Sequence, residues 1–137
     1  MRFEQVDVSA PGEWEGLRKQ LAPAFKLWTL GEDEIRERLE QGVMNAVRLV
    51  SGGEGIVVYQ VSEKPQGRVL YLTYAAGRLD GGPRERLMRM RSIEKTFEAE
   101  ARRIGCVEMQ GGGRNWHRLL NGWEPDGGDG VSLRKAL

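Results

Sequence analysis

The stretch GRLDGGPRE, residues 77–85, joins an apolar run to a long patterned segment and carries three glycines. Glycine lets a backbone approach a ligand closely, and the N–H groups at the start of a helix bind phosphates. The loop therefore has the residue types needed to hold the phosphate groups of a cofactor. Pro83 favours the alternative of a simple turn, because proline has no N–H to offer and is common at the first helical position.

Arginines gather just after this loop. Arg84, Arg86, Arg89 and Arg91 follow it, and Glu85 is the only acid among them. Cations at a helix N-terminus oppose the helix dipole by about 0.3–1 kcal/mol each when exposed. A bound anion would offset this cost, whether a cofactor phosphate or an acidic surface of a partner protein. The alternative is a solvated basic face with carboxylates supplied from elsewhere in the chain.

Other kinds of site are restricted by composition. His117 is the only histidine and Cys106 the only cysteine, so we expect no multi-histidine metal site and no internal disulfide. The 21 basic and 20 acidic residues give no basic excess, so we expect no direct nucleic-acid binding. No apolar run approaches the roughly 20 residues of a membrane helix, and the N-terminus is too polar for a signal peptide. We therefore expect a protein made in the cytoplasm, with no membrane partner.

Apolar spacing predicts the elements that would position these residues. We expect strands at 2–8, 46–50, 55–61, 69–75, 106–110 and 130–137, and helices from about residue 9 to an interruption at Pro23, at 29–42, at 83–103 and, briefly, within 111–123. Hairpin-length turns make the three middle strands antiparallel, and the long helix makes a strand–helix–strand crossover. The expected fold is α/β: one domain, residues 1–137, with a mixed, mostly antiparallel central sheet and helices on both faces.

This order of elements resembles the Gcn5-related N-acetyltransferase (GNAT) fold over nearly the whole chain. In that family, a loop with the pattern Arg/Gln-x-x-Gly-x-Gly/Ala binds the pyrophosphate of acetyl-CoA. Arg78 and Gly81 match its first and fourth places, with Gly82 beside them, and Pro83 stands in the sixth place instead of glycine or alanine. If CoA binds, the resemblance implies Arg78, Gly81, Gly82 and Arg84 as its binding residues.

The family's second landmark is an asparagine near the start of the last helix, followed by a tyrosine that acts as general acid toward the CoA thiolate. Asn115 matches the asparagine, and the resemblance implies it as a further cofactor-binding residue. Leu119 and Leu120 stand where the tyrosine would fall. His117 is the only titratable group of suitable kind in this segment and is therefore the candidate. The alternative is an exposed or packed histidine without a chemical role.

A narrower resemblance is to small GNAT-like proteins of short-tailed bacteriophages. It rests on residues 33–49, 68–85, 102–127 and 131–137, and its most specific part is GRNWHRLL, residues 113–120. It implies a phage origin, synthesis in the host cytoplasm, a final location in the virion and a role in virion assembly.

Two functions follow from these resemblances. The first is a non-catalytic virion or morphogenesis protein that needs no cofactor, occurs in several copies in a ring and binds portal, adaptor (head–tail connector) or internal virion proteins. Because tryptophan and arginine are preferred interface anchors, the candidate contact residues are Arg86, Arg89, Arg114, Trp116 and Trp123. The second is an N-acetyltransferase that uses acetyl-CoA to modify an amine on a protein or a small molecule.

Overall fold

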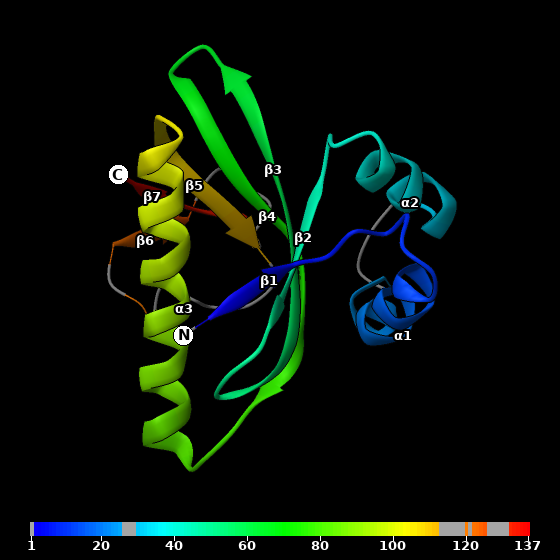
Figure 1. Ribbon diagram of the computed structural model, residues 1–137. Coiled ribbons are helices and arrows are strands. Elements are labelled where there is room, and N and C mark those ends of the chain that lie inside the picture. The colour runs from blue at the N-terminus through cyan, green and yellow to red at the C-terminus, as the bar shows by residue number, and fades with distance from the viewer. Residues whose placement is uncertain (1, 26–29, 113–119, 121, 126–131) are drawn as a thin grey trace. The chain divides into compact units, whose positions relative to one another are not determined.

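The computed structural model describes residues 2–25, 30–112, 120, 122–125 and 132–137 (Figure 1). The described elements are β1 (Phe3–Gln5), α1 (Glu13–Phe25), α2 (Glu32–Glu40), β2 (Asn45–Leu49), β3 (Gly53–Lys64), β4 (Gly67–Leu79), α3 (Pro83–Arg103), β5 (Cys106–Gly112), β6 (Trp123–Pro125) and β7 (Ser132–Ala136). The predicted order of strands and helices is confirmed as far as β5. Most of the short helix expected within 111–123 lies outside the described residues, and the three-residue strand β6 was not predicted.

The strands form one sheet in the order β1-β2-β3-β4-β5-β7-β6. The pairs β1–β2, β2–β3, β5–β7 and β6–β7 are antiparallel. The pair β4–β5 is parallel, and α3 connects its two strands. The predicted mixed, mostly antiparallel sheet with one strand–helix–strand crossover is therefore confirmed.

The chain consists of two compact units. One contains Met1–Gln60 and Tyr74–Asp80, and the other contains Val61–Thr73 and Gly81–Leu137. In the first unit, α1 contributes Leu17 and Leu21, which are spaced one helical turn apart and fully buried. They join a core that also includes Ile35 of α2. Burying each such side chain contributes about 1.5–3 kcal/mol, so this apolar stripe is what holds α1 to the unit.

The interruption predicted at Pro23 does not occur, because α1 continues through this residue to Phe25. Proline inside a helix costs about 3 kcal/mol, since it removes one hydrogen bond and its ring clashes with the preceding turn. Leu21 and Ala24 are buried on either side of Pro23. Their packing favours the helical conformation in this last turn. The next helix, α2, is shorter than predicted, and Gly42 ends it in the left-handed conformation, with φ +76°.

Strand β4 is longer than predicted and takes up the first three residues of the GRLDGGPRE stretch. Strand β3 is extended to match, and the Asp80 N–H donates to the Gly52 carbonyl at 3.0 Å. The two backbones approach so closely that a Cβ on Gly53 would overlap the Arg78 carbonyl. Glycine is therefore what allows the pairing to continue to Leu79. The prediction that Arg78 lies in the loop is therefore wrong, because this residue lies on β4.

In the second unit, α3 packs against β5 (Figure 1). Its bounds, Pro83–Arg103, are those predicted from the apolar stripe. Val69 and Leu70 of β4 are both fully buried, although consecutive strand residues point to opposite faces. This start of β4 is thus covered on both faces, as its continuous apolar run predicted. In the described part of the chain, no helix is long and apolar enough to cross a membrane.

Candidate functional site

The start of α3 has the local geometry of an anion-binding helix end. Gly82 is the N-cap in an extended conformation, and Pro83 is the first helical residue. The Arg86 N–H donates to the Gly82 carbonyl at 2.9 Å, which makes the first helical hydrogen bond. An α-helix leaves its first N–H groups without helical acceptors. Because Pro83 has none, the donors at this end are the N–H groups of Gly82, Arg84 and Glu85.

Gly81 is required by both its conformation and its surroundings. Its φ is +97°, and a Cβ built on it would lie 2.6 Å from Glu85 Oε2. The Glu85 side chain therefore folds back over the loop, next to the helix end. A carboxylate in the first turn is favoured by the helix dipole, so the chain places an anion of its own at this end. A phosphate would have to displace it.

The other predicted cofactor and interface residues are distributed as follows. Arg84 and Arg86 are exposed on the first turn of α3, and Arg89 is half-buried. Arg78 is exposed at the end of β4. Asn115, His117, Arg114 and Trp116 lie outside the described residues. Among the described residues, no group of three His, Cys, Asp or Glu side chains is placed to hold a metal ion.

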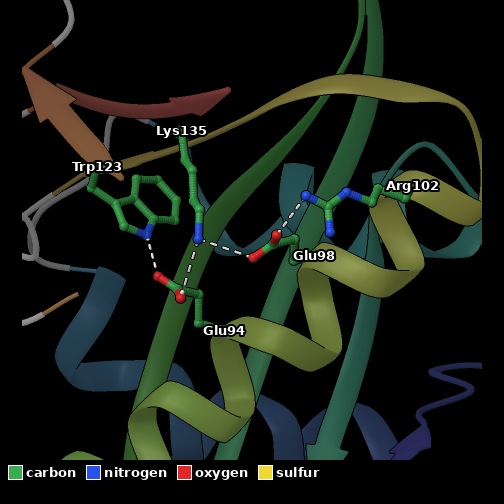
Figure 2. Close-up of polar contacts among 5 residues, drawn as sticks. All are labelled: Glu94, Glu98, Arg102, Trp123 and Lys135. Atoms are coloured by element: carbon green, nitrogen blue, oxygen red, sulfur yellow. Dashed lines mark hydrogen bonds and ion pairs between the residues drawn. The ribbon is translucent and has the colours of Figure 1, made fainter. Parts of the chain in front are cut away.

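Trp123 lies in a buried polar network on the sheet side of α3 (Figure 2). Its exposed fraction is 9%. The indole Nε1 donates to Glu94 Oε2 at 2.5 Å, and Lys135 Nζ lies 3.3 Å from Glu94 Oε1 and 2.9 Å from Glu98 Oε2. Arg102 completes the network with Glu98 at 2.8 Å. Strands β6 and β7 are thereby tied to α3 through two carboxylates.

The hydrogen bonds of the network set the protonation of its members. The Lys135 ammonium, by donating to Glu98, holds the pKa of that carboxyl below its ordinary value. Burial lowers the pKa of Lys135, but the carboxylates of Glu98 and Glu94 together raise it more. Glu98 and Lys135 are therefore both charged near neutral pH. We call this network of Trp123, Glu94, Glu98, Arg102 and Lys135 the brace. We assign it a structural role and no proton transfer.

A second polar cluster, which the sequence analysis did not identify, crosses the sheet within the same unit. Tyr71 of β4 is in register with Gln110 of β5, Gln110 with Arg134 of β7, and Arg134 with Glu124 of β6. Residues in register on neighbouring strands share a face of the sheet. We call these four residues the polar row. Glu108 adjoins it on β5.

Glu108 is the buried carboxylate of this cluster. Its side chain is 11% exposed, its Oε2 accepts a hydrogen bond from Gln110 Nε2 at 2.6 Å, and its Oε1 lies 3.9 Å from Arg134 Nη1. The same arginine makes a shorter contact, 3.1 Å, with Glu124, which is 62% exposed. The sequence does contain a signal for this cluster. In CVEMQ, residues 106–110, the polar residues Glu108 and Gln110 alternate with apolar ones, and alternate residues of a strand share a face.

Comparison with known proteins agrees with this architecture. The chain superimposes on an aminoglycoside 6′-acetyltransferase type Ii with a TM-score of 0.60, covering 99% of this chain and 97% of that one at 13% sequence identity. For FeeM, an N-acyl amino acid synthase from uncultured soil microbes, the TM-score is 0.59, with 100% and 94% coverage and 12% identity. A probable acetyltransferase gives 0.59, with 87% and 83% coverage and 13% identity.

The chain has the GNAT fold. The predicted resemblance to that fold is thereby confirmed at the level of architecture. No family model matches the sequence, and no curated protein matches it either. At 12–13% identity the solved structures show the fold alone.

Proposed function

We propose that the chain is an acyltransferase that binds acetyl-CoA and transfers its acyl group to an amine. The observation that carries the proposal is the helix start of the GNAT fold, where Gly81 and Gly82 lead into α3. The fit to a pyrophosphate rests on two features. In the described chain no side-chain hydrogen bond caps this helix end, and three of its backbone N–H groups have no helical acceptor. The side chain that crowds Gly81 is that of Glu85, which is long enough to swing away.

The residues that would hold the cofactor are those of the first turn. The N–H groups of Gly82, Arg84 and Glu85 would bind the pyrophosphate, and the Arg84 and Arg86 guanidinium groups would add charge. Glu85 would turn away, because its carboxylate repels a phosphate. When bound, acetyl-CoA supplies an acyl group activated as a thioester.

The acceptor amine needs a group that takes its proton. Glu108 is the candidate for this step, because it is a mostly buried carboxylate next to the polar row. Three members of the polar row next to it, Tyr71, Gln110 and Arg134, offer hydrogen-bonding and charged groups to an acceptor. In our proposal, Glu108 first attracts the ammonium form of the acceptor and then accepts its proton.

A second candidate is a protein-binding role without catalysis. Two features favour it: Glu85 already supplies an anion at the helix end, and Pro83 removes one N–H donor. The virion proteins implied by the sequence resemblance, namely portal, adaptor or internal proteins, would be the partners of this candidate, and it would need no cofactor.

Calorimetric titration with acetyl-CoA distinguishes the two candidates. We expect the wild-type chain to bind acetyl-CoA, and Glu85→Gln to bind it about two- to fivefold more tightly. The reason is that the Glu85 carboxylate no longer competes with the pyrophosphate for the helix end, an interaction of about 0.3–1 kcal/mol. Acetyl-pantetheine, which has no pyrophosphate, should show no such gain. Glu100→Gln is the matched control, because it removes the same charge about 22 Å further along the same helix. Its carboxylate pairs with Arg103 at the far end of α3, so this variant should bind like the wild type.

A lack of binding by both the wild type and Glu85→Gln would overturn the acyltransferase proposal and favour the protein-binding role. If both bind acetyl-CoA but with equal affinity, the pyrophosphate does not contact this helix end, and the assignment of Gly81 and Gly82 is wrong.

A further inference from the structure

Two helices of this nearly neutral chain carry opposite, unbalanced charge. Helix α2 has five carboxylates against two arginines. The first half of α3, residues 84–95, has five cations against two carboxylates. One of those two, Glu94, is engaged in the buried network with Lys135. Charge of each sign is thus concentrated on one helix, although the whole chain has a formal net charge of +1.

Two cations in the middle of α3, Arg91 and Lys95, lack the ion pairs that most arginines of the described chain make. Carboxylates lie within ion-pair distance of Arg18, Arg36, Arg38, Arg48, Arg68, Arg102, Arg103 and Arg134. Arg91 and Lys95 are exposed, and no described carboxylate lies within that distance of either.

Helix α2 offers the complementary pair. Asp33 and Glu37 are exposed, and no described cation lies within ion-pair distance of either. The Gln41 side-chain amide, which is neutral, donates to Glu37 at 3.2 Å. Their neighbours on the helix are neutralised locally, since Glu34 pairs with Arg38 and Glu40 with Arg36. The uncompensated negative charge of α2 is therefore on the stripe of Asp33 and Glu37.

The spacing of the two pairs matches. Arg91 and Lys95 are four residues apart, as are Asp33 and Glu37, and four residues rise about 6 Å along a helix. An antiparallel arrangement sets Arg91 opposite Glu37 and Lys95 opposite Asp33, and it also opposes the two helix dipoles favourably. Met88, which is 67% exposed, then lies toward the C-terminal end of α2, where Val43 is 49% exposed.

We propose that α2 of one copy of this chain docks antiparallel against α3 of a second copy, through Asp33, Glu37, Arg91 and Lys95. The contact joins two different surfaces, so successive copies either close into a ring or continue as an open filament, and the smallest closed form is a dimer that makes the contact twice. A single pair of helices buries less than the roughly 1,200 Å² of a stable interface, so association is weak and sensitive to salt. This inference does not depend on acyl transfer.

Sedimentation equilibrium at low salt, over a wide range of concentrations, tests the contact. We expect Arg91→Glu/Lys95→Glu and, separately, Asp33→Lys/Glu37→Lys to weaken self-association at least tenfold, which is about 1.4 kcal/mol. The variant that combines all four substitutions restores complementary charge and should associate again. Arg2→Glu/Lys19→Glu makes the same charge change at exposed positions outside both helices and should associate like the wild type. Circular dichroism checks that each variant is folded.

Three results would overturn the proposal: a wild-type chain that stays monomeric at every concentration, double variants that associate unchanged, or a fourfold variant that fails to recover. A different result would place the charges within one chain. In that case the two double variants would have non-additive effects on the unfolding free energy, and these effects would not depend on protein concentration. The intermolecular contact would then be wrong.

Discussion

Glu108 and Glu124 reach the same arginine from β5 and β6, the two strands that flank β7, but their surroundings differ. Glu108 is 11% exposed and Glu124 is 62% exposed. If Glu108 takes the proton of the acceptor amine, Glu108→Gln removes the base but keeps an oxygen that can accept the hydrogen bond from Gln110. We expect kcat/KM for acetyl transfer to fall a hundredfold or more, with acetyl-CoA binding unchanged.

The measurement is the release of CoA thiol in the presence of primary amines such as lysine and spermidine. The loss in Glu108→Gln should shrink as pH rises, because the free amine then needs no base. Glu124→Gln removes a carboxylate from the same arginine and is the matched control, with activity like the wild type. Equal activity in all three proteins would exclude Glu108 from the reaction.

At the scale of elements, the brace between α3 and the β6–β7 pair makes a prediction about pH. The Lys135 ammonium lowers the pKa of Glu98 from its ordinary value of 4.5. A carboxyl whose folded pKa is depressed stabilises the fold above its unfolded pKa, and this stability is lost as pH falls through the folded pKa. At neutral pH, Glu98→Gln should therefore lower the free energy of unfolding by about 1–3 kcal/mol, because it leaves Lys135 partly unpaired.

Urea denaturation at neutral pH and again below pH 4 checks this expectation, and the difference between Glu98→Gln and the wild type should shrink at the lower pH. The control is Glu40→Gln, which breaks an exposed pair with Arg36 and should change stability by less than about 0.5 kcal/mol. A Glu98→Gln effect as small as that of Glu40→Gln would show that the brace contributes little.

The elements that sequence reasoning predicted well carry their signals locally. Helix α3 combines an apolar stripe with Pro83 at its start and Gly105 after its end, so its bounds were predictable. Strand β6 has three residues, one of them proline, and exists because β7 pairs with it. The extension of β4 to Leu79 likewise depends on β3 offering a partner. Such long-range pairing leaves little trace in the local sequence.

The same distinction applies to the candidate site. The position of Gly81 and Gly82 just before α3 was predictable, because a glycine-rich turn followed by proline is typical of a helix start. Their role toward a cofactor stays a prediction. The carboxylate of Glu85 over Gly81 depends on a side-chain conformation, which spacing does not determine. The hydrogen bond from Trp123 to Glu94 joins residues 29 positions apart. Glu108 was predictable in principle, from its alternation with Gln110, but its burial depends on neighbouring strands.

At the scale of the whole molecule, the two compact units share two strands. Strand β3 contributes its first part to the first unit and Val61–Lys64 to the second. Strand β4 contributes its first part, up to Thr73, to the second unit and its remainder, from Tyr74, to the first. If one unit unfolds, it disrupts two strands that continue into the other unit. We therefore predict that the 137 residues unfold as one cooperative domain, as most chains of this size do.

Trp14 and Trp123 report on the two units, because each is buried in a different one. Two variants, each with one of these as the only tryptophan and phenylalanine at the other three positions, separate their signals. Within each variant, the urea transition followed by fluorescence should coincide in midpoint and slope with that followed by far-UV circular dichroism. A fluorescence midpoint that departs from the circular dichroism midpoint in either variant would mean that one unit unfolds while the other stays folded, and that the shared strands do not couple them.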